Sequence, residues 1–373
     1  MIDHRKQRFI TLDGTRGIAA LCVMLFHFTH NGMATDVLFP NAVAAVDYFL
    51  CLSGFVLASS YDGRLGNGMK AGEFMKRRFI RLYPMYLLGF LLGLALEILA
   101  PTLPRDWGQL SLSAGMALIF LPSLAPFGQR VGNLSVPDFA FPFNTPAWSL
   151  FFELAVNWIY AVAQPTTKAL LVLVSISFVG LAQSLYFHGV APGFTVQSLA
   201  GGVPRTLFFF FSGVLIFRFW RHFPPRLPAF WPILSCAAVA MICALPFNKY
   251  TYLAGTFTIP TLVWSAARAP ETQFEKRIYS WLGEISYSIY AIHFPVVLAL
   301  QALTNTRNSP YMSLGNAVAL AVALAIAGFL LSRTWDTWAR QVLSTWLANA
   351  AAKPVAHLGN AAKYPSSQIL QPP

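Results

Sequence analysis

The sequence predicts an all-α polytopic membrane protein, and three observations lead to this prediction. Only 11% of the residues are charged, against about 25% in an average soluble domain, which is too few to cover a water-facing surface. Hydrophobic residues make up 56% of the chain. They form long runs separated by short basic segments, a pattern typical of helices that cross a bilayer. We expect about ten transmembrane helices plus one interfacial or re-entrant segment.

A transmembrane helix needs about 20 mainly apolar residues to cross about 30 Å of hydrocarbon. Ten runs meet this requirement, at roughly 12–31, 42–60, 79–99, 146–163, 169–187, 203–220, 229–247, 250–267, 281–303 and 311–332. An eleventh run at 108–125 is bounded by prolines, and we interpret it as interfacial or re-entrant on the outer side. The alternative is an eleventh spanning helix, which would put the two chain ends on opposite sides of the membrane.

Basic residues cluster between the apolar runs, and this distribution explains the net charge of +12 better than nucleic-acid binding does. The clusters are Arg5, Lys6 and Arg8; Lys76, Arg77, Arg78 and Arg81; Arg218, Arg221 and Arg226; and Arg268, Lys276 and Arg277. Ten spans place all of them on one side of the membrane. The basic clusters therefore predict an integral membrane protein with both termini cytoplasmic. We expect the membrane to be a bacterial inner membrane. One membrane-embedded domain is expected over 1–340, followed by a poorly ordered cytoplasmic tail over 341–373.

Several ionisable residues lie inside the predicted spans, where a charge costs about 2.5–3.5 kcal/mol at the bilayer centre. At 1.5 Å of rise per residue, His27, Asp47, Glu153 and His293 fall in the outer half of the membrane at similar depth. A histidine facing carboxylates can act as a general base near neutral pH. A packing role for His293 is the alternative interpretation.

Arginines form a second layer at the cytoplasmic rim, with Arg16 on the first span and Arg78 and Arg81 at the start of the third. Guanidinium groups bind phosphates in a bidentate manner. A ligand that reaches both layers would carry phosphates at one end and a reactive group on a long arm, as acyl-coenzyme A (acyl-CoA) does. The alternatives are that these arginines only determine topology, or that the protein is a transporter or flippase of a lipid-linked or anionic solute.

Four cysteines without CxxC spacing lie in apolar runs, so the sequence predicts neither a disulfide framework nor a metal site.

Five segments, taken in order, resemble the acyltransferase 3 family of integral-membrane acyltransferases, which modify extracytoplasmic glycans and some small molecules. They are LDGTRGIAALCVMLFHF (12–28), VDYFLCLSGFVL (46–57), KRRFIRLYPMY (76–86), PAWSLFFELAVNWIY (146–160) and LGEISYSIYAIHFPV (282–296). The family's arginine followed by ten residues and a histidine matches Arg16 and His27. Its RxxR element matches Arg78 and Arg81, and its Trp-Ser-Leu-x-x-Glu element matches Trp148, Ser149 and Glu153.

The resemblance implies an enzyme with a ten-helix core that transfers an acyl group to an acceptor hydroxyl on the outer side. Acyl-CoA, expected as acetyl-CoA, is the co-substrate, and no tightly bound cofactor is expected. The expected partners are an extracytoplasmic glycan or glycolipid acceptor and the lipid bilayer, with no nucleic acid.

The mechanism expected from these residues assigns catalysis to His27 and Glu153, and acyl-CoA binding to Arg16, Arg78 and Arg81. Direct transfer and an acyl-histidine intermediate both stay open, as do the acceptor, the acyl length and the oligomeric state. Ser149 or Tyr287 is expected as the oxyanion donor, and Asp47 or Glu153 is expected to orient His27. The residues expected to support catalysis or bind the acceptor are Asp13, Asp47, Trp148, Ser149, Tyr287 and His293.

Overall fold

The computed structural model describes residues 9–30, 37–99, 106–124, 129–131, 134–136, 139–188, 191–220, 227–270, 273–304 and 314–356. Each of the ten predicted spans contains a helix. The elements are α1 Ile10–His30, α2 Val43–Gly66, α3 Ala71–Leu99, α4 Trp107–Leu118, β1 Gln129–Val131, β2 Leu134–Val136, α5 Ala147–Ala163, α6 Thr167–His188, α7 Leu199–Trp220, α8 Trp231–Ala244, α9 Lys249–Ala267, α10 Gln273–Thr304, α11 Leu314–Arg333 and α12 Trp335–Ala356.

The predicted fold class is confirmed, whereas the count of ten spans is not. Within the described residues, seven helical segments are long and apolar enough to cross a membrane, namely α1, α2, α3, α6, α7, α10 and the continuous stretch Leu314–Asn349. Helices α5 and α8 are apolar but shorter, with 17 and 14 residues. The two short strands pair antiparallel as a hairpin and add no sheet layer.

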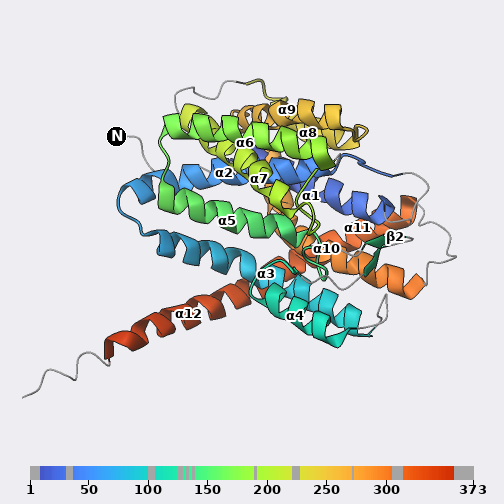
Figure 1. The fold of residues 1–373 in the computed structure, drawn as a ribbon. Coiled ribbons are helices and arrows are strands. Elements are labelled where there is room, and N and C mark those ends of the chain that lie inside the picture. Colours follow the sequence, from blue (N-terminus) through green and yellow to red (C-terminus); the bar gives the residue numbers. More distant parts are fainter. Residues whose placement is uncertain are drawn as a thin grey trace, which may run out of the picture.

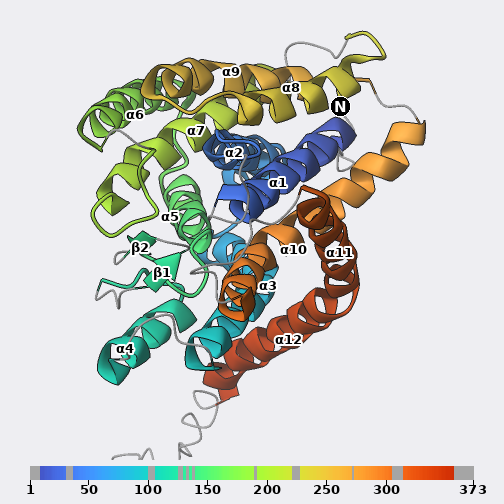
Figure 2. The same cartoon turned by 90° about the vertical axis from the view of Figure 1, so that its right-hand side faces the viewer.

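The bundle has three layers, which Figure 2 shows most clearly. Helices α6, α8 and α9 lie along one side, α1, α2 and α7 lie in the middle, and α3, α10, α11 and α12 lie on the other side. The most extensive helix contacts join α1 to α10 and α2 to α7. These contacts place α1, α2, α3, α5 and α10 around the centre of the molecule (Figure 1).

Helix α4 occupies the first part of the ambiguous run at 108–125. It begins where the Asp106 carboxylate accepts hydrogen bonds from the backbone N–H groups of Gly108 and Gln109, at 2.8 and 3.1 Å. Its 12 residues extend about 18 Å, which is less than the hydrocarbon thickness. Figure 1 shows α4 away from the end of the bundle that carries the α2–α3 turn. The interfacial or re-entrant position of this helix stays a prediction.

Helices α1 and α10 approach closely because glycine stands at their crossing. A Cβ atom added at Gly17 would lie 2.4 Å from Cβ of Leu282, and one added at Gly283 would lie 2.7 Å from Cβ of Asp13. Both separations are far below van der Waals contact, so a larger side chain at either position would push the helices apart. This contact fixes the register between the two helices that carry Arg16, His27 and His293.

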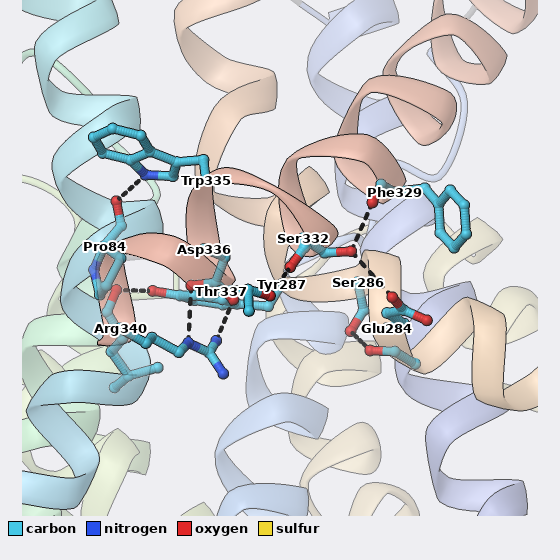
Figure 3. Close-up of polar contacts among 12 residues, drawn as sticks. Pro84, Glu284, Ser286, Tyr287, Phe329, Ser332, Trp335, Asp336, Thr337 and Arg340 are labelled. Atoms are coloured by element: carbon cyan, nitrogen blue, oxygen red, sulfur yellow. Dashed lines mark hydrogen bonds and ion pairs between the residues drawn. The ribbon is translucent and has the colours of Figure 1, made fainter. Parts of the chain in front are cut away.

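Helix α12 continues as far as Ala356 and so includes the start of the segment from 341 that was expected to be a poorly ordered tail. Its first residue is fixed on α3, where Nε1 of Trp335 donates a 3.0 Å hydrogen bond to the Pro84 carbonyl (Figure 3). Helix α12 then runs away from the bundle, as Figure 1 shows. The first part of the expected tail, residues 341–356, is therefore helical.

Candidate active site

A cavity opens between α1, α2, α3, α5 and α10, with an empty volume of about 840 Å³ that includes its open mouth. It brings together six of the predicted site residues, which are Arg16, Arg78, Arg81, Ser149, Glu153 and Tyr287. The other polar groups of the lining are Ser53, Ser286 and Tyr290, and the rest is apolar. Arginines from two helices therefore share one internal space with a carboxylate and several hydroxyl groups.

Glu153 lies beside the arginines in this cavity, with its carboxylate paired to Arg78. Its Oε1 accepts from Nη2 of Arg78 at 2.6 Å and from Oγ of Ser53 at 2.7 Å. The expected placement of Glu153 in the layer of His27 is therefore wrong for this conformation. The physical reason is that residues 139–146 are buried, so α5 begins inside the bundle and not at the membrane surface. A depth counted from the helix start consequently misplaces Glu153.

Arg16 is held in place by both helices of the close α1–α10 pair. Its Nη2 donates to Oδ1 of Asp13 at 3.0 Å and to the Gly283 carbonyl at 2.8 Å. Its Nε donates to Oγ of Ser286 at 3.0 Å. These bonds aim the guanidinium at the cavity that it lines, and they give Asp13 the role of positioning Arg16.

Arg81 differs from the other two arginines of the cavity. It is exposed, and no hydrogen bond or ion pair joins it to another residue within the part of the chain that the structure describes. It lines the cavity from α3, one turn after Arg78. Arg81 therefore presents a cationic group to the open mouth.

His27 and His293 face each other across the α1–α10 contact. Nδ1 of His27 lies 2.9 Å from the Val23 carbonyl and 3.3 Å from Nε2 of His293. Nδ1 of His293 lies 3.0 Å from the Ile289 carbonyl. Because a carbonyl oxygen only accepts hydrogen bonds, each neutral ring carries its hydrogen on Nδ1. Nε2 of His27 is thus the nitrogen that can take up a proton, and Nε2 of His293 accepts from His27.

Tyr290 lies between the cavity and this pair of histidines, and sequence reasoning missed it. Its hydroxyl lies 2.7 Å from Oγ of Ser149 and 3.0 Å from the Pro146 carbonyl. Its ring contacts the ring of His293, with 5.9 Å between centroids. His27 and His293 are not among the residues that line the cavity. Tyr290 therefore separates the cavity from the histidines in this conformation.

Tyr287 was expected as a candidate oxyanion donor. Its hydroxyl instead donates to the Leu82 carbonyl, so the hydroxyl is occupied in this conformation. The side chain still lines the cavity. Ser149 and Tyr290 are the hydroxyl groups at the end of the cavity nearest to the histidines.

Asp47 forms a fully buried ion pair with Arg205 and does not line the cavity. Its Oδ1 accepts from Nε of Arg205 at 2.6 Å, and both side chains are 0% exposed. The guanidinium lies 4.9 Å from the Trp148 ring centre and donates to the Pro192 carbonyl at 2.8 Å. Asp47 was expected to orient His27 or to bind the acceptor, whereas in the structure its carboxylate pairs with Arg205, which also contacts Trp148.

Arg205 was missed because it stands in the apolar run assigned to the sixth span. The signal was present, since an arginine inside a span is always costly without a partner. No group of three or more histidine, cysteine, aspartate or glutamate side chains in the described ranges could hold a metal ion.

These features define a polytopic membrane protein with a polar site enclosed by its helices. The family model described as "acyltransferase domain" matches residues 9–333, and the chain belongs to this acyltransferase 3 family. It is therefore a membrane acyltransferase.

Three curated proteins illustrate the similarity. The chain is 38% identical to "Protein 2 in picA locus" of Rhizobium radiobacter over 47% of this chain and 93% of that protein. It is 31% identical to "Acyltransferase MdmB" of Streptomyces mycarofaciens, over 40% of this chain and 38% of that protein. It is 26% identical to "Putative membrane-bound transacylase BcsY" of Komagataeibacter xylinus, over 88% of this chain and 83% of that protein. No solved structure matches the chain.

Proposed function

We propose that this protein transfers an acyl group, in particular acetyl, from cytoplasmic acyl-CoA to a hydroxyl of an extracytoplasmic glycan or glycolipid. The observation that carries the proposal is the order of groups along the site. Arginines line the cavity, Ser149 and Tyr290 close its inner end, and the pair of His27 and His293 follows directly behind Tyr290. A thioester arm that is anchored by its phosphates would extend along this line.

His27 acts as the general base of the reaction. As the acceptor oxygen attacks the thioester carbonyl, Nε2 of His27 takes the hydroxyl proton. The carbon–sulfur bond then breaks, and the proton passes to the departing thiolate, which gives an ester and free CoA thiol. The Val23 carbonyl and Nε2 of His293 both accept from Nδ1–H of His27, so they hold the ring and stabilise its protonated form.

Tyr290 has to move for the acyl group to reach His27. Within the described residues, its hydroxyl is hydrogen-bonded only to Ser149 and to the Pro146 carbonyl. Rotation of the side chain would join the cavity to the histidines and leave the Ser149 hydroxyl available to the developing oxyanion.

In this proposal, the basic clusters determine how the protein is oriented in the membrane. Both chain ends and the α2–α3 turn lie in the cytoplasm, because lysine and arginine are retained on that side. The cavity mouth beside Arg81 then faces the soluble pool of acyl-CoA, and the histidines lie toward the outer leaflet.

Purified protein is expected to release free CoA thiol from acetyl-CoA when cell-envelope glycans from cells lacking the gene are added. A thiol reagent measures the release, and radiolabelled acetyl identifies the modified glycan by mass spectrometry. A transporter or flippase would move its solute without consuming acetyl-CoA. Absence of both thiol release and label transfer, with short and long acyl donors, would contradict the proposal.

Replacing Glu153 by glutamine tests whether this carboxylate pairs with Arg78 or assists His27 in the chemical step. Glutamine keeps an oxygen for Arg78 and Ser53 but removes the negative charge, so the cavity becomes more positive. We expect an unchanged or lower KM for acyl-CoA and a kcat reduced less than about 10-fold, because the base itself is intact.

The matched control is Ser53→Ala, which removes the second hydrogen bond to Glu153 and keeps the charge. A kcat reduced 100-fold or more in the glutamine variant alone would instead place Glu153 in the chemical step.

A further inference from the structure

Helix α12 brings two further charged side chains, Asp336 and Arg340, close to the cavity, although neither belongs to its lining. Nε of Arg340 donates to Oδ1 of Asp336 at 2.9 Å, and the two side chains also pair through Nη2 and Oδ2. The Asp336 side chain is 9% exposed and that of Arg340 is 30% exposed. Figure 3 shows both next to Tyr287, which lines the cavity. Helix α12 follows the matched region 9–333, so this pair lies outside that region.

Arg81 directly precedes Leu82, whose carbonyl accepts a hydrogen bond from the Tyr287 hydroxyl, and Figure 3 shows Asp336 and Arg340 beside Tyr287. Two guanidinium groups, from α3 and from α12, are therefore held near each other at the mouth. The two positive charges repel each other, and an anion bound between them would offset this repulsion.

The charges around the cavity do not cancel, and the excess positive charge lies at Arg81. Arg16 is paired with Asp13, Arg78 with Glu153 and Arg340 with Asp336. Arg81 lacks such a pair with any described residue, so four guanidinium groups face three carboxylates. The surplus positive charge is exposed at the mouth, where a soluble anion first meets the protein.

We propose that the phosphate groups of the donor nucleotide bind between Arg81 on α3 and Arg340 on α12. This inference rests on the proposed function, and it assigns the phosphates to the mouth of the cavity. Arg78, which is bonded to Glu153 at 2.6 Å, then serves deeper in the cavity and is not the main phosphate ligand.

Arg340 is well prepared for this role. Asp336 holds its guanidinium from one turn earlier on the same helix, and Trp335 anchors that turn on the Pro84 carbonyl of α3. A side chain that is already ordered loses little conformational freedom when it binds a ligand. Arginine also offers the planar pair of donors that suits a phosphate group.

The test measures the affinity of CoA for the purified full-length chain by titration calorimetry. Arg81→Gln and Arg340→Gln are each expected to weaken binding about 10- to 100-fold, the range for a hydrogen bond to a charged group. Arg340→Lys keeps the charge and should lose less. Arg77→Gln is the matched control, because Arg77 is exposed on α3, pairs with Glu73 and is not a phosphate ligand in this proposal.

A donor without phosphates separates binding from a general structural effect. Acetyl-pantetheine lacks the nucleotide, so Arg340→Gln and the unaltered protein should turn it over at equal rates. An equal loss with both donors would overturn the inference, as would normal CoA affinity in Arg340→Gln while the unaltered protein binds CoA. Failure of the unaltered protein to bind CoA would overturn the proposed function together with this inference.

Discussion

Replacing His27 by alanine is expected to lower turnover about 100- to 10,000-fold, the usual contribution of a general base. The reason is geometric as well as chemical. Hydrogen bonds to the Val23 carbonyl and to His293 place the ring hydrogen on Nδ1, so Nε2 is the basic atom. The measurement is kcat from the release of CoA thiol at saturating acetyl-CoA. KM for acetyl-CoA should change little, because the arginines that bind the donor lie elsewhere in the site.

Leu25→Ala is a suitable control for this prediction. Leu25 lies on the same turn of α1 and packs against the apolar cluster between α1 and α10, but it carries no titratable group. Both variants should elute as folded protein in detergent, and only the His27 variant should lose its turnover. Full activity in folded His27→Ala protein would remove His27 from the mechanism.

The sequence alone predicts that His27 and His293 lie at a similar depth, and the structure brings their rings into contact. Both residues were placed in the outer half of the membrane by counting along their helices. The structure confirms only that the two rings lie side by side, which follows because α1 and α10 are long and because Gly17 and Gly283 fix their register by direct contact. The arginines of the cavity were grouped correctly for a similar reason, since Arg78 and Arg81 lie one turn apart on one helix.

The same count misplaces Glu153, because the buried segment 139–146 lets α5 begin within the bundle. A sequence read by hydropathy assumes that each helix begins at the membrane surface, and only tertiary packing shows otherwise. Tyr290 was missed because a tyrosine in an apolar helix carries no signal of its own. Its role depends on the position of Ser149, which lies 141 residues away in the chain.

Breaking the buried pair of Asp47 and Arg205 is expected to destabilise the protein by about 3–5 kcal/mol, since either single change leaves an uncompensated charge in the interior. Asp47→Leu would leave the guanidinium of Arg205 without its anion. Arg205→Met would also deprive the Pro192 carbonyl of its donor. The measurement is thermal unfolding of the purified variants in detergent, followed by size-exclusion chromatography.

The double variant Asp47→Leu with Arg205→Met decides between a structural and a chemical role for Asp47. Replacing both members of a buried pair by apolar side chains of similar size is often close to neutral for stability. If the pair only supports the fold, the double variant should regain most of the lost stability and also regain acyl transfer. A double variant that is stable but inactive would show that the carboxylate of Asp47 acts in the reaction. The two alternatives differ because a structural charge needs only its partner, whereas a chemical group is needed even when its partner has been removed.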